Sequence, residues 1–158
     1  MKYLLATLIL YIPFSSYANE VPVMSMTDLQ EQTRKINFSK PEKTYIIQVM
    51  ASWCASCSGN FGKILDNIPA NRKNLSILAI SVDDNLKTFQ IYYEKNKHKW
   101  NTKNKDVTFL LDKEGSELKQ LALKGIPTTF IIRNKKVIKS IAEVHDISII
   151  TDLLKTSH

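Results

Sequence analysis

Residues 45–57 read Tyr-Ile-Ile-Gln-Val-Met-Ala-Ser-Trp-Cys-Ala-Ser-Cys, and this stretch decides the fold. Its first six residues are largely apolar, which is typical of a buried central strand. Cys54 and Cys57 follow directly and are the only two cysteines of the chain. If a helix begins there, the two side chains lie one turn apart and can close a small, easily reopened disulfide. Because so short a loop adds little stability through chain entropy, the pair suits electron exchange better than structural cross-linking.

Hydrophobic periodicity beyond the cysteines predicts alternating helices and strands. Apolar residues at steps of three and four predict a helix over residues 61–68 that ends before Pro69. Asp83 or Asp84 is expected to cap a helix over residues 86–93. The other expected elements are strands at 75–82, 107–111, 128–133 and 137–142, a short helix at 116–124, a hairpin turn at Asn134-Lys135, and a last helix capped by Asp146. This order predicts one α/β domain, a three-layer sandwich with a mixed central sheet flanked by helices.

The N-terminus has the pattern of an export signal. A lysine at position 2, an apolar stretch over residues 3–14 and small residues up to Ala18 predict a signal peptide at 1–18, cut after Ala18. About a dozen apolar residues are too few for the ~20 of a spanning helix. We therefore expect a soluble mature chain in the periplasm or another extracytoplasmic compartment. Residues 19–44 are expected to form a lead-in with a short helix from Thr27 to about Lys35, followed by the domain at 45–158.

The charge is moderately basic. The chain has a net charge of +7, and part of it lies in a lysine-rich run over residues 95–105 near Tyr92, Tyr93 and Trp100. No nucleic-acid recognition motif accompanies this run, so we expect no nucleic-acid partner and interpret the run as a solvated lysine face. Attraction to an acidic partner or to an anionic membrane surface is the second interpretation of the same charge.

The roles of the two cysteines follow from their order. Cys54 would stand at the N-terminus of the expected helix, where unpaired amides and the helix dipole stabilise a thiolate and lower its pKa. Cys54 is therefore the expected nucleophile, which forms a mixed disulfide with a partner. Cys57, one turn deeper, would then attack Cys54 and release the reduced partner.

Two motifs together resemble the thioredoxin superfamily: Trp-Cys-x-x-Cys after a buried strand, and Gly-Ile-Pro-Thr-Thr-Phe at residues 125–130 before a hairpin. The resemblance implies a thioredoxin-like fold in which Pro127 is cis and faces the cysteines, while the backbone of Ile126 pairs with substrate. The implied substrate-facing residues are Trp53, Ala55, Ser56, Ile126, Pro127 and Thr128. The long interval between Cys57 and Pro127 leaves room for an extra helix and strand, as in the exported branch that resembles TlpA and ResA.

The resemblance also implies a function. It predicts an exported thiol-disulfide oxidoreductase without a cofactor that reduces protein disulfides or apocytochrome c thiols and is recharged by a membrane electron donor of the DsbD or CcdA kind. A periplasmic disulfide oxidase or isomerase is the alternative direction of the same chemistry. Two positions depart from the family, because Gln48 and Asn60 stand where related proteins place carboxylates that assist proton transfer. Asp83, Asp84 and Asp112 could substitute, although acids near strand ends more often cap helices or turns.

A metal carrier is the competing class, since paired thiolates bind Cu(I) or Zn(II). A third ligand would have to be His98, His145 or His158, the only histidines of the chain. Each is expected to be an exposed surface residue, so the sequence predicts no metal site.

Overall fold

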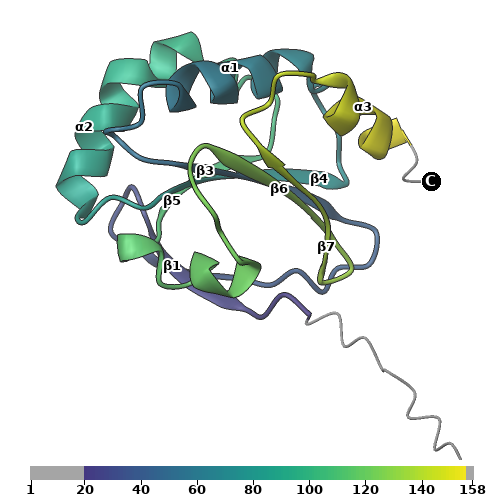
Figure 1. Cartoon of the computed structure of the whole chain (residues 1–158), viewed down its shortest axis with the longest axis horizontal. Coiled ribbons are helices and arrows are strands. Elements are labelled where there is room, and N and C mark those ends of the chain that lie inside the picture. Colours follow the sequence, from purple (N-terminus) through teal and green to yellow (C-terminus); the bar gives the residue numbers. More distant parts are fainter. Residues whose placement is uncertain (1–19, 156–158) are drawn as a thin grey trace, which may run out of the picture.

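The computed structural model describes residues 20–155 and forms one seven-stranded mixed sheet with the strand order β2-β1-β5-β4-β3-β6-β7 (Figure 1). The predicted signal peptide and His158 lie outside the described residues. The elements are β1 Met24–Asp28, β2 Thr33–Ile36, β3 Thr44–Met50, α1 Cys57–Asn67, β4 Leu75–Ser81, α2 Leu86–Asn96, β5 Val107–Leu111, β6 Thr128–Arg133, β7 Lys136–Ala142 and α3 Ser148–Lys155. Short 3-10 helices cover Lys97–Lys99, Lys113–Gly115 and Leu118–Leu121. None of the helices in residues 20–155 combines the length and apolar character needed to cross a membrane.

The centre of the sheet is the predicted buried strand. All seven residues of β3 are buried, because β4 pairs with it in parallel, β6 pairs with it antiparallel, and both faces are covered. Helices α1, α2 and α3 lie on one face, and the short helix Leu118–Leu121 lies on the other (Figure 1). Ile46 and Met50 of β3 join the core under the α-helices, whereas Ile47 and Val49 join the core on the opposite face. Gln48 therefore points to the face that carries α1.

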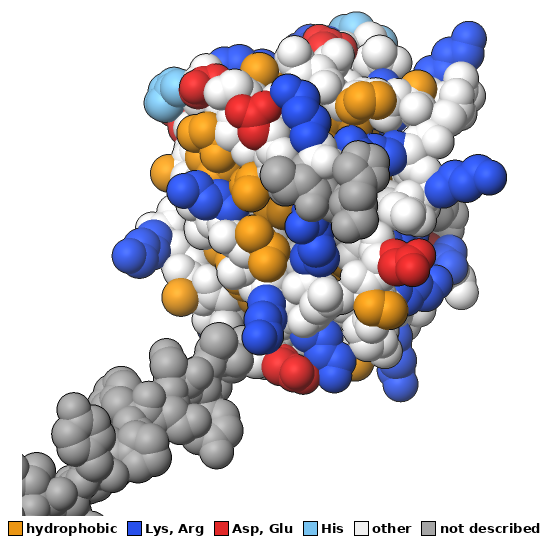
Figure 2. All heavy atoms as spheres, turned by 90° about the vertical axis from the view of Figure 1, so that its right-hand side faces the viewer, with side chains coloured by type: hydrophobic (Ala, Val, Ile, Leu, Met, Phe, Trp, Pro, Cys, Tyr) orange, Lys and Arg blue, Asp and Glu red, His pale blue; other side chains and the backbone are white. Residues whose placement is uncertain are grey.

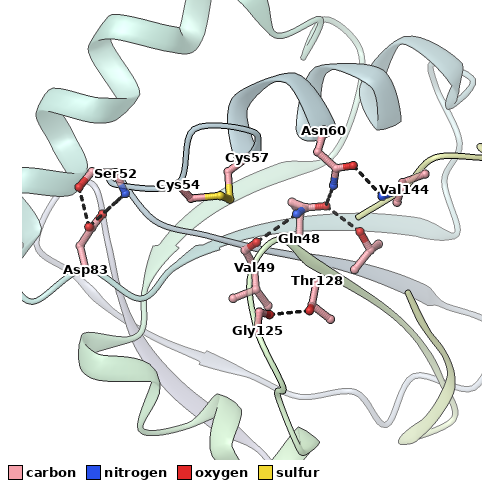
Figure 3. Close-up of a disulfide and its surroundings, with 11 residues drawn as sticks. Gln48, Val49, Ser52, Cys54, Cys57, Asn60, Asp83, Gly125, Thr128 and Val144 are labelled. Atoms are coloured by element: carbon pink, nitrogen blue, oxygen red, sulfur yellow. Dashed lines mark hydrogen bonds between the residues drawn. A yellow bond between two sulfur atoms is a disulfide. The ribbon is translucent and has the colours of Figure 1, made fainter. Parts of the chain in front are cut away.

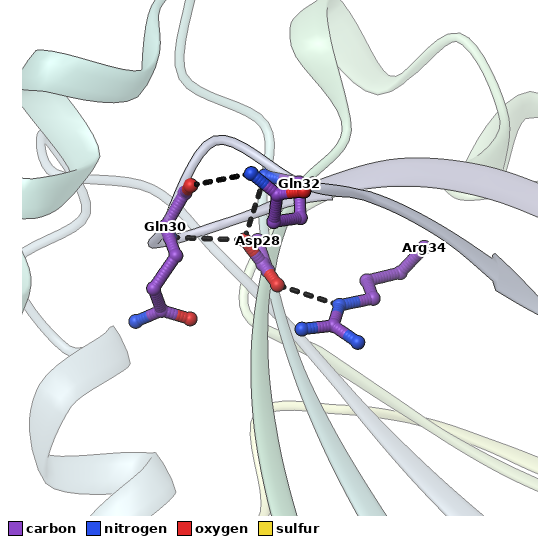
Figure 4. Close-up of polar contacts among 4 residues, drawn as sticks. All are labelled: Asp28, Gln30, Gln32 and Arg34. Carbon is purple, nitrogen blue, oxygen red and sulfur yellow. Dashed lines mark hydrogen bonds and ion pairs between the residues drawn. The ribbon is translucent and has the colours of Figure 1, made fainter.

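The expected helix from Thr27 to Lys35 is wrong. Residues 24–36 form an antiparallel hairpin that extends the sheet beyond β5, so they belong to the domain and are not a helical lead-in. Met24 and Met26 are buried on alternate positions of β1, a period-2 pattern that the sequence reasoning did not use. The Asp28 carboxylate orders the turn by accepting hydrogen bonds from the backbone amides of Gln30 and Gln32, both at 2.9 Å (Figure 4).

The other predicted elements are confirmed in part. The strands at 107–111 and 128–133 are confirmed, and Asn134 and Lys135 form the tight turn before β7 with φ of 50° and 58°. The expected helix at 116–124 is only a four-residue 3-10 turn, which ends at Ala122 in the left-handed conformation with φ of 52°. Asn85, not Asp83 or Asp84, caps α2 by accepting from the amide of Thr88.

Strand β7 is an edge of the sheet, and six of its seven residues are exposed. It carries Lys136 and Lys139, and Figure 2, which faces the side of α3 and β7, shows Lys and Arg side chains spread among apolar ones. Charged lysines on an edge strand oppose pairing with a second chain.

Candidate active site

Cys54 and Cys57 form a disulfide where β3 leads into α1 (Figure 3). Their Cα atoms are 5.5 Å apart, within the ordinary range for a disulfide. Cys57 is the first residue of α1 and is fully buried, whereas Cys54 lies in the preceding turn and is 9% exposed. The expectation that Cys54 itself begins the helix is thus corrected by three residues. Cys54 is nevertheless the more accessible of the two cysteines, as the sequence predicts.

The residues around Cys54 present a mostly exposed rim. Trp53 is 70% exposed, the highest value among the exposed large hydrophobic side chains of residues 20–155, and Ala55 and Ser56 are also exposed. The exposed indole ring is therefore not part of the hydrophobic core. An exposed tryptophan beside a disulfide offers a flat apolar contact surface.

Asp83 anchors the chain just before this rim. Its buried carboxylate accepts hydrogen bonds from the Ser52 backbone amide at 3.1 Å and the Ser52 hydroxyl at 2.7 Å (Figure 3). It also accepts from the Ser81 hydroxyl at 2.7 Å. This carboxylate therefore ties the end of β4 to the start of the disulfide turn. It is engaged in holding the backbone, a role that sequence reasoning did not assign to it.

The second motif lies at the same end of the sheet. The Ile126–Pro127 peptide bond is cis. Thr128 begins β6 opposite Val49, so the register brings Pro127 to the end of β3 that leads to the cysteines. Pro127 is buried and Ile126 is half-buried. The Thr128 hydroxyl donates to the carbonyl of Gly125 at 2.6 Å, which closes the turn before β6 (Figure 3).

Neutral amides occupy the two positions where the resemblance to thioredoxins implies carboxylates. Asn60 Nδ2 donates to Gln48 Oε1 at 3.1 Å, and the Thr129 hydroxyl donates to the same oxygen at 2.7 Å. Gln48 Nε2 donates to the Val49 carbonyl, and Asn60 Oδ1 accepts from the Val144 amide at 2.8 Å (Figure 3). We call these residues, Gln48, Asn60, Thr129 and Val144, the amide network. It joins β3, α1, β6 and the segment before α3 without a titrating group.

The remaining candidate residues do not reach the site. Asp112 accepts from the amides of Glu117 and Leu118 and so caps a turn, and Asp84 is exposed. His98 and His145 are exposed surface residues, as expected. Within residues 20–155, no three His, Cys, Asp or Glu side chains form a group that could hold a metal ion.

Two hollows differ in their relation to the disulfide. A groove of about 440 Å³ is lined by Cys54 and Ala55 together with residues of α2. A larger hollow of about 630 Å³ lies between the β1–β2 hairpin and β5 and contains no cysteine. The redox chemistry therefore belongs to the smaller groove, and sequence reasoning missed the α2 side chains that line it.

Comparison with solved structures supports the fold. A protein from Chlorobium tepidum assigned as thiol:disulfide interchange protein DsbE has a TM-score of 0.70 and 19% identity, with 88% of this chain and 95% of that chain covered. StoA from Bacillus subtilis has a TM-score of 0.62 and 17% identity, with coverages of 85% and 97%. A thiol-disulfide oxidoreductase from Bacteroides fragilis has a TM-score of 0.66 and 15% identity, with coverages of 87% and 98%. No curated protein matches the chain significantly.

The fold and the Cys54–Cys57 pair, of which only Cys54 borders the surface, define a thioredoxin-like protein that carries out thiol-disulfide exchange. The Redoxin family model matches residues 17–154, and the chain belongs to that family. Family membership together with the Cys54–Cys57 disulfide makes it a thiol-disulfide oxidoreductase.

Proposed function

We propose that the protein is an exported oxidoreductase that reduces disulfides of protein substrates, including apocytochrome c. The observation that carries the proposal is the difference between the two sulfurs: Cys54 borders an open groove, while Cys57 is sealed beneath it. A partner disulfide can reach Cys54 only, and Cys57 can reach Cys54 only. This arrangement separates an attacking thiol from a resolving thiol.

The proposed exchange has two balanced steps. The Cys54 thiolate attacks one sulfur of the partner disulfide, forming an S–S bond to it while the other partner sulfur leaves as a thiolate. The Cys57 thiolate then attacks Cys54 Sγ, which forms the intramolecular disulfide and releases the second partner thiolate. Two electrons pass to the partner, and the protein ends in the oxidised form that the structure contains.

The first step needs a thiolate at Cys54. The turn of residues 54–57 leads into α1, and Ser56 at its N-cap position makes no side-chain capping hydrogen bond. The first-turn amides of α1 therefore lack a side-chain acceptor and favour negative charge nearby. In the proposed site, Trp53, Ala55 and Ser56 face the substrate on one side of Cys54, and Ile126, Pro127 and Thr128 face it on the other.

Regeneration requires an electron donor, and we propose one of the membrane-embedded DsbD or CcdA kind. Residues 1–18 would direct the chain to the periplasm or an equivalent compartment, with cleavage after Ala18. The name of one structural neighbour, a thiol:disulfide interchange protein DsbE, supports this placement. Reaction in the reverse direction would instead make the protein an oxidase or isomerase.

The reduction potential of the Cys54/Cys57 couple tests the direction. We expect a value near the ≈ −270 mV of thioredoxin after equilibration against dithiothreitol, read by thiol alkylation. A value near the ≈ −120 mV of a strong oxidant would overturn the reductase proposal in favour of disulfide formation.

Single-cysteine variants test the two roles. Cys57→Ser should accumulate a mixed disulfide with substrate, because the resolving thiol is gone, whereas Cys54→Ser should neither turn over nor trap. Trapping by Cys54→Ser, detected on non-reducing gels, would reverse the assignment.

A further inference from the structure

The groove beside Cys54 is built largely by one face of α2. Ile91, Tyr92 and Lys95 line it, Lys99 extends it past the helix end, and Cys54 and Ala55 form its other side. These α2 positions recur at three or four residues, so they share one helix face. Helix α2 lies beside the start of α1 in Figure 1. The groove therefore leads along α2 directly to the reactive sulfur.

The charged side chains that line this groove are both basic. Lys95 and Lys99 are both exposed, and no acidic side chain lines the groove. Within residues 20–155, neither lysine forms an ion pair, whereas the neighbouring Lys97 pairs with Glu94 at 2.6 Å. Lys99 Nζ instead donates to the neutral Asn96 side chain at 3.1 Å, which holds the charge at the groove. Two free cations beside Cys54 attract a carboxylate.

Tyr92 supplies an independent sign of a missing ligand. It lines the groove, only 8% of the residue is exposed, and its hydroxyl is the one buried side-chain polar atom without a hydrogen-bond partner in the described part of the chain. The adjacent Ser58 hydroxyl is committed to Asn96 at 2.9 Å. Burial raises the pKa of Tyr92 to about 12; the nearby Ser58 hydroxyl lowers it and the negative charge of Asp83 raises it further, so the phenol is neutral at pH 7. A buried neutral donor without an acceptor is unusual in native proteins.

The rim adds an apolar contact. Ile91, which lines the groove, is 61% exposed, and Trp53, which precedes Cys54 in the chain, is 70% exposed. From Thr88 to Lys99 the helical path is roughly 16 Å, since each residue rises about 1.5 Å. That length accommodates about five extended residues and exceeds the roughly 10 Å of a tripeptide thiol. The dimensions favour a protein segment.

We propose that this groove recognises an acidic segment next to the substrate's cysteine. A carboxylate of the segment binds Lys95 and Lys99, an acceptor of the segment takes the Tyr92 hydroxyl, and an apolar side chain packs on Ile91 or Trp53. This inference names the substrate class of the proposed oxidoreductase and rests on that function. It also assigns part of the lysine-rich run to substrate selection.

The test uses two disulfide-containing peptides of identical sequence, one with three Glu residues beside the cysteine and one with Gln at the same positions. Stopped-flow exchange with the reduced protein should be about five- to tenfold faster for the Glu peptide at low salt, and this ratio should fall at high salt. Lys95→Gln combined with Lys99→Gln should bring the ratio close to one. Lys136→Gln combined with Lys139→Gln on β7 removes the same charge far from the groove and should keep the ratio. Equal rates for both peptides with the wild-type protein would overturn the proposal.

A binding measurement separates this inference from the redox function. The Glu peptide with Ser in place of Cys is titrated into the oxidised full chain while backbone amides are followed by NMR. We expect chemical-shift changes at the amides of Ile91 and Lys95, and smaller changes with the Gln peptide. The Tyr92→Phe variant should bind the Glu peptide about threefold more weakly than wild type. If these shifts appear but the reduced protein does not reduce the disulfide peptides in the stopped-flow experiment, the proposed oxidoreductase function is wrong and the acidic-segment site still stands. Chemical-shift changes confined to other surfaces would refute the site. Faster exchange with oxidised glutathione than with the Glu peptide would mean that the groove binds a small acidic disulfide and not a protein segment.

Discussion

Replacing Asn60 by alanine should destabilise the protein strongly, because Asn60 connects two parts of the amide network. The change removes the acceptor of the buried Val144 amide, which costs about 1–3 kcal/mol when a buried donor is left unpaired. Gln48 Oε1 also loses one of its two donors but keeps Thr129, at a cost of about 0.5–1.5 kcal/mol. Alanine returns roughly 0.6 kcal/mol through its higher helix propensity. The expected loss of unfolding free energy is therefore about 1–4 kcal/mol.

A matched control lies on the same helix. Asn67 is exposed, and its side-chain amide donates only to the Lys63 carbonyl one turn earlier. Asn67→Ala should therefore change stability by less than about 0.5 kcal/mol. Urea unfolding of both variants with the Cys54–Cys57 disulfide oxidised, followed by tryptophan fluorescence, measures the difference. If Asn60→Ala matched Asn67→Ala within about 0.5 kcal/mol, the amide network would not be the structural support that we describe.

Two further predictions concern carboxylates. Asn60→Asp places an acid in the amide network, where burial should raise the pKa of the new carboxyl in the folded state above the usual ≈ 3.9. The variant should therefore lose stability relative to wild type as pH rises from about 4 through that raised pKa. A constant difference in unfolding free energy between pH 4 and pH 8, measured with urea, would contradict this. In wild type, burial alone would raise the pKa of Asp28, but hydrogen bonds from Gln32, Arg34 and Gln30 outweigh it and hold the pKa below its usual range. The stability that Asp28 contributes is present above about pH 4 and is lost as pH falls through the lowered pKa. Asp28→Asn should therefore be less stable than wild type at pH 7 and approach the stability of wild type at pH 3. An equal difference in unfolding free energy at both pH values would show that the charge of Asp28 is not involved.

Much of the sheet was predictable because its strands are strongly patterned. The run at 45–50 is apolar at nearly every position, and only a strand covered on both faces buries all of it. The hairpin of Asn134 and Lys135 was predictable for a local reason, since tight turns need residues that tolerate positive φ. By contrast, Thr27 and Gln30 fit a helix cap locally, yet pairing of β1 with β5 placed the segment in the sheet. Long-range strand pairing overrides such weak local signals.

The candidate site also has a part that the sequence predicted and a part that it did not. Cys54 and Cys57 are separated by only two residues, so their pairing and the greater exposure of Cys54 were predictable, although α1 begins only at Cys57. The substitutions at Gln48 and Asn60 were visible as missing carboxylates, but their mutual hydrogen bond was not. The side chains of Tyr92, Lys95 and Lys99 line one groove with Cys54 only because α2 packs beside the start of α1.

The sequence by itself determined the chemistry of this protein, because two cysteines two residues apart after a buried strand can react without help from distant segments. Tertiary structure alone decided what surrounds that chemistry: a neutral amide network that joins β3, α1 and β6, an exposed Trp53 next to Cys54, and a basic groove along α2. The physical reason is that these features depend on which faces of separate elements meet. Such meetings are settled by burial over the whole sheet, and no short stretch of the chain encodes them.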